Sequence, residues 1–262
     1  MTLFFHEIKM NWKSLAIWTI CVAGMCFGCI LLYYSVEDSI VGIADSFSNM
    51  GAMSAAFGMD KMSIATLAGY YATEIALMHG LGGAMFAAIL GAGLLSGEEG
   101  AHTSEFLTTL PIGRKKIVLI KYLSMLSSIL ILNLISVALY ILAFAIMGED
   151  IGRKELLLYH LASTIMQMEI GSVCFMVSAF ARKSMVGVGL GITVMAFAMD
   201  IMSRIVPAIE NLKYATPFYY SNAADIFTSG EINAVILGIG LGITVLSFAI
   251  SLWKYDRKDL AA

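Results

Sequence analysis

Six long apolar stretches separated by shorter polar segments dominate the pattern of this 262-residue chain. Three of them carry no charged residue over a bilayer-spanning length, residues 14–36, 122–148 and 232–253. About 20 apolar residues cross the hydrocarbon core at roughly 1.5 Å each. The other three are interrupted by one or two titratable side chains. The pattern predicts an all-α integral membrane protein with six transmembrane helices, over residues 14–35, 72–96, 117–147, 156–181, 184–206 and 232–253.

Composition agrees with a membrane protein, because 59% of the residues are hydrophobic and only 13% are charged. A soluble domain usually carries about 25% charged residues. We expect a single membrane domain over residues 1–262 and no soluble domain large enough to fold alone. The phosphate-binding pattern Gly-x4-Gly-Lys-[Ser/Thr] does not occur. Energy for any transport must therefore come from an ion gradient or from another polypeptide.

The positive charges divide unequally between the two sides that six spans create. One side receives both termini and 11 of the 16 Lys and Arg residues, and the other side receives five. Basic residues accumulate in cytoplasmic segments. Both termini are therefore predicted to be cytoplasmic.

Three segments outside the spans have expected roles. Residues 1–13 place Phe4, Phe5, Ile8 and Trp12 roughly on one helical face, which favours an interfacial helix. Residues 37–71 are too apolar for a free loop, and we expect them to lie on the outer surface or to pack over the helix ends. Residues 207–231 are predicted to form an outer re-entrant or surface loop, with aromatic anchors at the interface.

The segment between the second and third spans, "SGEEGAHTSEFLTTLPIGRKK", is charged and contains a proline. Thr103 is placed to cap a short helix over residues 104–110, with Glu105 in its first turn, where the helix dipole favours an anion. Pro111 ends that helix. The sequence predicts an amphipathic coupling segment over residues 98–116 that docks on a partner. The alternative is a solvated loop with an incidental helical turn.

At these residues the chain resembles the permeases of type-2 ATP-binding-cassette (ABC) exporters, which have an ABCG-like six-helix fold. Their pattern in this loop is close to E-x-x-x-G-T-x-E-x-L-x-x-x-P-x-x-R-x-x-I-x-x-x-K. His102 stands where relatives have glycine, so the local turn differs from the pattern. The matching positions are Glu98, Thr103, Glu105, Leu107, Pro111, Arg114, Ile117 and Lys121.

The resemblance implies that this loop contacts a separate nucleotide-binding ATPase, which binds ATP and Mg, so that this chain has no ATPase activity or cofactor of its own. It also implies a second permease, either an identical copy or a paralogue, in the bacterial cell membrane. Neither a catalytic residue nor a nucleic-acid partner is expected. The coupling residues are Glu98, Glu99, Thr103, Glu105, Phe106, Leu107, Leu110, Pro111 and Arg114.

Charges inside the membrane cost on the order of 2.5–3.5 kcal/mol each on insertion scales and so require a reason. Glu169 is the deepest, on a span made polar by His160, Ser163, Thr164 and Gln167. It faces either a translocation path or an internal hydrogen-bonding partner. The remaining pathway candidates are Glu74 and the pair Asp200 and Arg204, which are four residues apart and can form an ion pair along one helix face.

Small residues recur four apart on three spans, which lets helix backbones approach closely in lipid. They pack either within one chain or at a dimer interface. The only Cys-x-x-Cys, Cys26 to Cys29, lies inside the first span without further ligands, and we expect no metal site. The small residues are Gly80, Ala84 and Ala88, Gly187 and Gly191, and Gly238 and Gly242.

These features favour the membrane subunit of an ATP-driven exporter that moves an amphiphilic cargo, such as a hydrophobic peptide, a lipid or a drug. The alternative from another class is an ion-coupled secondary transporter that uses Glu169. A membrane-anchored sensor or scaffold is a third class. Only the exporter explains the charged segment at residues 98–116.

Overall fold

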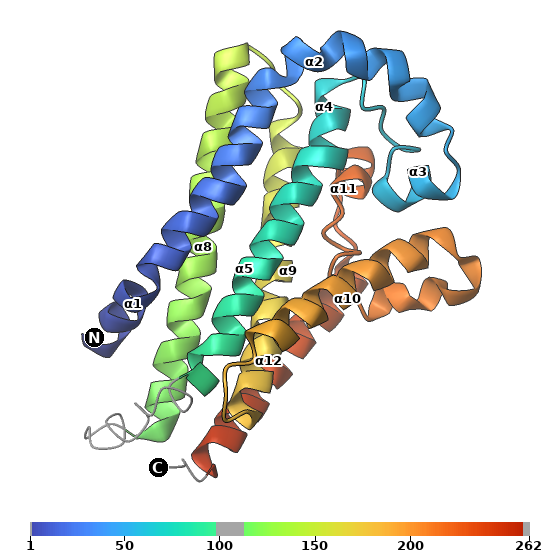
Figure 1. Ribbon diagram of the computed structural model, residues 1–262. Helices are drawn as coiled ribbons and strands as arrows, with labels where there is room; N and C mark the ends of the chain where they lie inside the picture. The colour runs from blue at the N-terminus through green and yellow to red at the C-terminus, as the bar shows by residue number, and fades with distance from the viewer. Residues whose placement is uncertain (1, 98–112, 259–262) are drawn as a thin grey trace.

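A computed structural model describes residues 2–97 and 113–258, and all of the regular structure in these two ranges is helical (Figure 1). Within these ranges, six helices are long and apolar enough to cross a membrane, as the sequence predicts. Their bounds are Leu3–Ser48, Leu67–Leu94, Arg114–Met147, Arg153–Phe180, Val186–Ile205 and Ala234–Asp256.

The first of these helices is built from α1 (Thr2–Thr19), one π-helical turn (Ile20–Gly24) and α2 (Met25–Ser48). The helix is continuous between residues 2–13 and the apolar run, so a separate interfacial helix is not confirmed. It also continues past its predicted end at residue 35, because Ile40, Ala44 and Phe47 recur at helical spacing and pack on the following segment.

The second span consists of α4 (Leu67–Tyr70), a π turn (Tyr71–Ile75) and α5 (Ala76–Leu94). The Thr66 hydroxyl caps its start by accepting a hydrogen bond from the amide of Gly69 at 3.1 Å. The other spans are α8 (Arg114–Met147), α9 (Arg153–Phe180), α10 (Val186–Ile205) and α12 (Ala234–Asp256).

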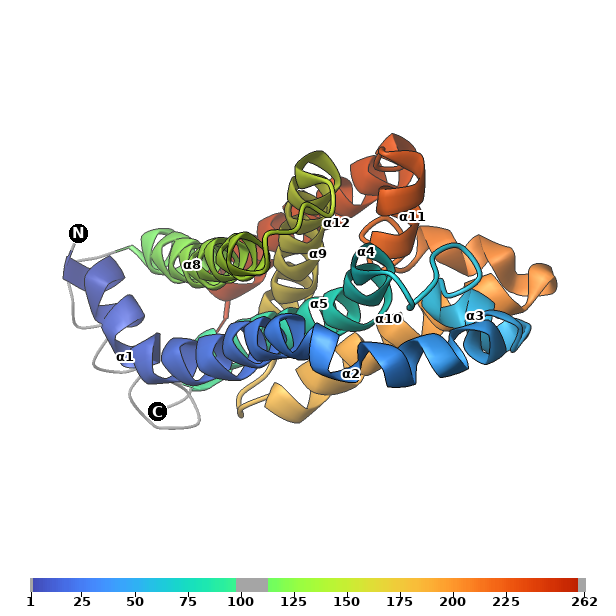
Figure 2. The same ribbon diagram turned by 90° about the horizontal axis from the view of Figure 1, so that it is seen from above.

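α5 and α9 form the centre of the bundle, and α8, α10, α12 and the first helix surround them (Figure 2). Glycines allow this close packing. A Cβ atom at Gly91 of α5 would lie 2.3 Å from the carbonyl oxygen of Gly171 on α9. A Cβ atom at Gly189 of α10 would lie 3.0 Å from the carbonyl oxygen of Ala88. The small residues of α5 therefore pack within one chain, whereas Cβ atoms at Gly187, Gly191, Gly238 and Gly242 would meet nothing within 4 Å.

Both termini lie at one end of the bundle, here called the terminal end, and the segments at the opposite, distal end form a cover (Figure 1). Residues 37–66, here called the distal cap, comprise the end of α2, the short helix α3 (Ala52–Phe57) and the chain that leads to α4. Met59 and Ile64 are buried against Phe47 of α2. The expected loop over residues 37–71 is thus largely helical, and of the two arrangements considered from the sequence, the structure has it pack over the helix ends.

Residues 207–231 form a 3-10 helix (Pro207–Tyr214), an irregular turn and the short helix α11 (Ala223–Ser229). Asn222 caps α11 by accepting from the amide of Asp225 at 3.1 Å, and Asn233 caps α12 in the same way at 3.2 Å. Gly230 ends α11 at φ +69°, a conformation that favours glycine. These residues set the start and end of α11 and the start of α12.

Candidate functional site: polar groups between the spans

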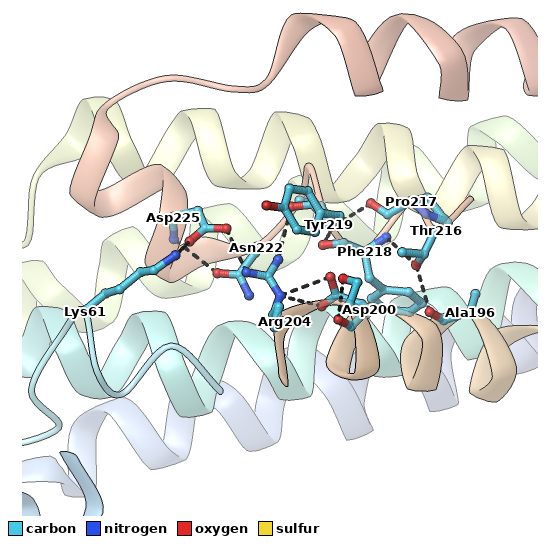
Figure 3. A network of polar contacts seen from close by, with 12 residues as sticks. Lys61, Ala196, Asp200, Arg204, Thr216, Pro217, Phe218, Tyr219, Asn222 and Asp225 are labelled. Carbon is cyan, nitrogen blue, oxygen red and sulfur yellow. Dashed lines mark hydrogen bonds and ion pairs between the residues drawn. The ribbon is translucent and has the colours of Figure 1, made fainter. Parts of the chain in front are cut away.

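Four charged side chains meet at the distal end, and we call them the distal charged cluster (Figure 3). The Arg204 guanidinium on α10 lies 3.1 Å from the Asp200 carboxylate and 2.8 Å from that of Asp225 on α11. Lys61 of the distal cap contacts Asp225 at 2.6 Å. The Asp200–Arg204 ion pair predicted from the sequence is therefore present. Its extension to Asp225 and Lys61 was not predicted, because those residues lie far away in the chain.

Side-chain and backbone groups of the turn before α11 hold this cluster in place. Arg204 lies 4.5 Å from the centre of the Tyr219 ring and donates to the Tyr219 carbonyl oxygen at 3.4 Å. Thr216 donates to the carbonyl of Ala196 at 2.7 Å, which fastens the turn to α10 (Figure 3). A Cβ atom at Gly58, where φ is +73°, would lie 2.4 Å from Cβ of Ala224. The cap therefore touches α11 at a position that only glycine fits.

The cluster is electrically balanced, with two carboxylates and two cations. Burial raises the pKa of Asp225, but the opposing effect of Arg204 and Lys61 is larger, so the pKa lies below its usual value. Asp225 therefore stays ionised at neutral pH. This carboxylate links three segments: the distal cap, α10 and α11.

A second group of polar side chains, the mid-bundle network, lies between α5, α8 and α9. His79 is 3.0 Å from the Asn133 amide oxygen and 3.2 Å from the Tyr140 hydroxyl. Asn133 donates to Gln167 at 2.6 Å, and Gln167 donates to Ser163 at 3.2 Å. All of these side chains are buried. Gln167, a pathway candidate, is thus a partner in an internal network.

His160 extends the network towards the distal end. Its Nε2 lies 2.8 Å from the Tyr71 hydroxyl, and its ring centre lies 4.7 Å from that of His79. Its Nδ1 is buried without a hydrogen-bonding partner among the described residues. The sequence indicated that α9 is polar but could not pair Tyr71, Asn133 or Tyr140 with it. The available signal was that three spans each carry a histidine, an asparagine or a glutamine.

Glu169 faces away from this network, towards α12. The Tyr220 hydroxyl donates to its carboxylate at 3.0 Å, and a Cβ atom at Gly240 would lie 2.3 Å from the same oxygen. Burial and the adjacent carboxylate raise the pKa of Tyr220 well above its usual value, so the hydroxyl keeps its proton and donates. Glu74 is half-buried in the π turn and belongs to neither group.

Charged contacts also join elements at the terminal end. Lys121 of α8 lies 2.7 Å from Glu7 of α1, and both side chains are buried. Lys115 lies 3.4 Å from Asp256 of α12 at the surface. Arg114 donates to the carbonyl of Lys258 at 2.7 Å. Arg114 is the coupling residue that lies within the described structure. The other coupling residues lie outside it: Glu98, Glu99, Thr103, Glu105, Phe106, Leu107, Leu110 and Pro111.

A cavity of about 50 Å³ lies between α5, α9 and α10, under α3 and the turn before α11. Asp200 and Asn222 provide part of its polar lining, and Phe197 and Phe218 are part of its apolar lining. In residues 2–97 and 113–258, no three His, Cys, Asp or Glu side chains are grouped to hold a metal ion.

A comparison with known protein families matches residues 1–260 to the ABC-2 family transporter proteins. The chain belongs to the ABC-2 family. No curated protein matches it significantly. Family membership makes this chain a membrane permease component of an ABC transporter, in which a separate subunit carries the ATPase activity. The match and the six apolar helices together establish a multi-pass membrane protein.

We expect the Gly240→Ala variant of the permease to lose about 1–3 kcal/mol of stability, because the added methyl group displaces Glu169 and Tyr220. Glu169→Ala in the same chain makes room and recovers part of the loss. Gly242→Ala is the matched control, since a Cβ atom there meets nothing within 4 Å. Thermal midpoints of the detergent-solubilised variants measure the effect. Equal midpoints for Gly240→Ala and Gly242→Ala would contradict the contact.

Proposed function

We propose that this ABC-2 permease is the membrane subunit of an ATP-driven exporter whose terminal end faces the cytoplasm of a bacterial cell. The observation that carries the proposal is the charged segment over residues 98–116. In the sequence it stands between α5, which ends at Leu94, and α8, which begins at Arg114, and both of these helix ends lie at the terminal end of the bundle (Figure 1). Eleven of the 16 Lys and Arg residues belong to the segments expected on this side. A partner that binds ATP and Mg in the cytoplasm docks there.

The cargo path is proposed to form between two permeases. The cavity between α5, α9 and α10 measures about 50 Å³, whereas pockets for drug-sized ligands measure about 300–1,000 Å³. A second pocket, of about 430 Å³, is lined by residues of the distal cap, the turn before α11, α11 and the segment that leads to α12. It lies outside the spans, so it provides no path between them. An amphiphilic peptide, lipid or drug therefore needs a larger space. A second copy of this chain, or a paralogue, supplies the other wall. The apolar outer surfaces of the peripheral spans suit such a cargo.

Alternating access follows from the position of the coupling segment. When the partner ATPases close around ATP, they push on residues 98–116 and tilt α5 and α8. Because α5 and α9 pack through Gly91 and Gly171, α9 moves with them. The space between the two permeases then opens towards the outer side. Binding energy at the ATPase thus shifts the equilibrium between two arrangements of the same helices.

Copurification tests this proposal. We expect the unmodified chain to purify with an ABC ATPase. We expect Glu105→Lys with Phe106→Ala to reduce the bound ATPase by about tenfold or more, because this variant reverses a charge and removes an aromatic ring of the proposed contact. Glu231→Lys, an exposed change at the distal end, is the control and leaves binding unchanged. Unchanged binding in the double variant would contradict the coupling role.

The ion-coupled alternative rests on Glu169, a buried carboxylate that bonds to Tyr220. It predicts a permease that works without an ATPase. Uptake of a fluorescent lipophilic dye by inside-out vesicles separates the two functions. Transport that needs ATP and stops when the ATPase is absent supports the exporter. Transport driven by a proton gradient alone, and lost in Glu169→Gln, supports the alternative.

A further inference from the structure

The ion pair between Glu7 and Lys121 is buried where most charges of the terminal end are exposed. Their side chains are 8% and 2% exposed, and Nζ lies 2.7 Å from Oε1. Lys115, also on α8, pairs with Asp256 of α12, and these two side chains are 72% and 41% exposed. Removing two charges from water costs several kcal/mol per ion unless the geometry compensates for it. A buried pair of this kind fixes the relative positions of two helices.

Lys121 lies directly beyond the segment that contacts the ATPase in the proposed function. α8 begins at Arg114, so Lys121 follows after about 10 Å of helix. A displacement of residues 98–116 moves the start of α8, and with it the ammonium group that holds Glu7. Through this contact the first helix receives the movement at its own terminal end.

The first helix then reaches across the whole permease. It runs without a break from the terminal end to Ser48. Measured along the helix, Ser48 follows Glu7 after about 60 Å. Near its distal end, Tyr33 donates to the carbonyl oxygen of Ala65 at 2.7 Å. Phe47 packs against Met59 and Ile64 in the distal cap. A shift of this helix along α8 therefore displaces the cap.

The cap in turn contacts the elements that close the distal end. Lys61 of the cap holds Asp225 of α11, and Asp225 holds Arg204 of α10. The first helix thus connects the start of α8 to the distal charged cluster by packed and ion-paired contacts. A coupling path requires such contiguous elements, together with a measured coupling between its ends.

We propose that Glu7 and Lys121 are positioning residues, which transmit the ATP-driven movement at the start of α8 to the first helix and so to the distal cap. This inference rests on the proposed function. It gives the N-terminal segment the role of connecting the start of α8 to the distal cap.

The experiment follows the cap in the purified permease–ATPase complex. The four native cysteines are replaced by alanine, and Met53, exposed on α3, becomes the single cysteine (Met53→Cys). Its reaction rate with a membrane-impermeant maleimide is measured with and without ATP and Mg. In the parent complex we expect ATP to change this rate. In Glu7→Gln we expect the ATP-dependent change to be lost while ATPase binding persists. The complex stays folded but has a lowered thermal midpoint, because the variant breaks a buried ion pair.

Two further variants make the result specific. The charge swap Glu7→Lys with Lys121→Glu should restore the ATP-dependent change, and it also decides the question if Glu7→Gln fails to fold. Asp256→Asn, which breaks the exposed pair, should keep the parent response. The proposal is overturned by a parent response in folded Glu7→Gln, by no response in the folded swap, or by no ATP effect in the parent complex. Failure of the proposed function is distinct, because then no ATPase copurifies with the unmodified chain.

Discussion

The Gly91→Ala variant is expected to fold poorly, because the added methyl group meets backbone atoms that cannot rotate away. A Cβ atom at position 91 would lie 2.3 Å from the carbonyl oxygen of Gly171 and 3.0 Å from the amide nitrogen of Phe175. To admit it, α5 and α9 must separate along the centre of the bundle. Overpacking of this kind costs about 3 kcal/mol or more. At about 2–4 °C per kcal/mol, the thermal midpoint falls by about 6–12 °C.

Gly93→Ala is the matched control on the same helix. A Cβ atom at Gly93 meets nothing within 4 Å, and alanine is favoured over glycine in a helix by about 1 kcal/mol. We therefore expect an unchanged or slightly raised midpoint. Both variants are compared in one detergent by their thermal midpoints and by the yield of monodisperse protein. If Gly91→Ala behaves like Gly93→Ala, the two helices are not packed as closely as the structure places them.

The six spans were predictable because each is a long apolar run. The length and composition of such a run identify a membrane-spanning helix, whichever helices pack beside it. The predicted ends differ from the observed ones mainly at the first span. There, Glu37 and Asp38 end the apolar run, so the span was predicted to stop at residue 35, yet the helix continues to Ser48. Backbone hydrogen bonding does not stop at the edge of the hydrocarbon core, and Ile40, Ala44 and Phe47 provide a face to pack.

The polar groups were predictable only where their partners are close in the chain. Asp200 and Arg204 are four residues apart, and helical geometry alone brings them together. Lys61 and Asp225 are 164 residues apart, so their contact depends on how the cap folds over α11. The same holds for His79 with Asn133. Sequence periodicity identifies a polar face, but it does not identify the helix that this face contacts.

A second large effect is expected at the distal end, where Arg204→Met removes the cation from between two carboxylates. The Arg204 side chain is 7% exposed and that of Asp200 is 5% exposed. Breaking a buried pair by removing one partner costs about 3–5 kcal/mol, because the other charge stays buried and uncompensated. Asp225 keeps Lys61 at 2.6 Å, so Asp200 accounts for most of the loss. We expect this variant to show a lowered thermal midpoint in detergent.

Two companion variants show whether the stranded Asp200 charge is the cause. Asp200→Asn in the Arg204→Met chain removes that charge and should recover a large part of the midpoint. Lys213→Met breaks the Lys213–Glu210 pair, in which the Glu210 side chain is 58% exposed, and should cost less than about 1 kcal/mol. If Asp200→Asn lowers the midpoint further, Asp200 is stabilised by groups other than Arg204, and the cluster does not hold α10 to α11 through this arginine.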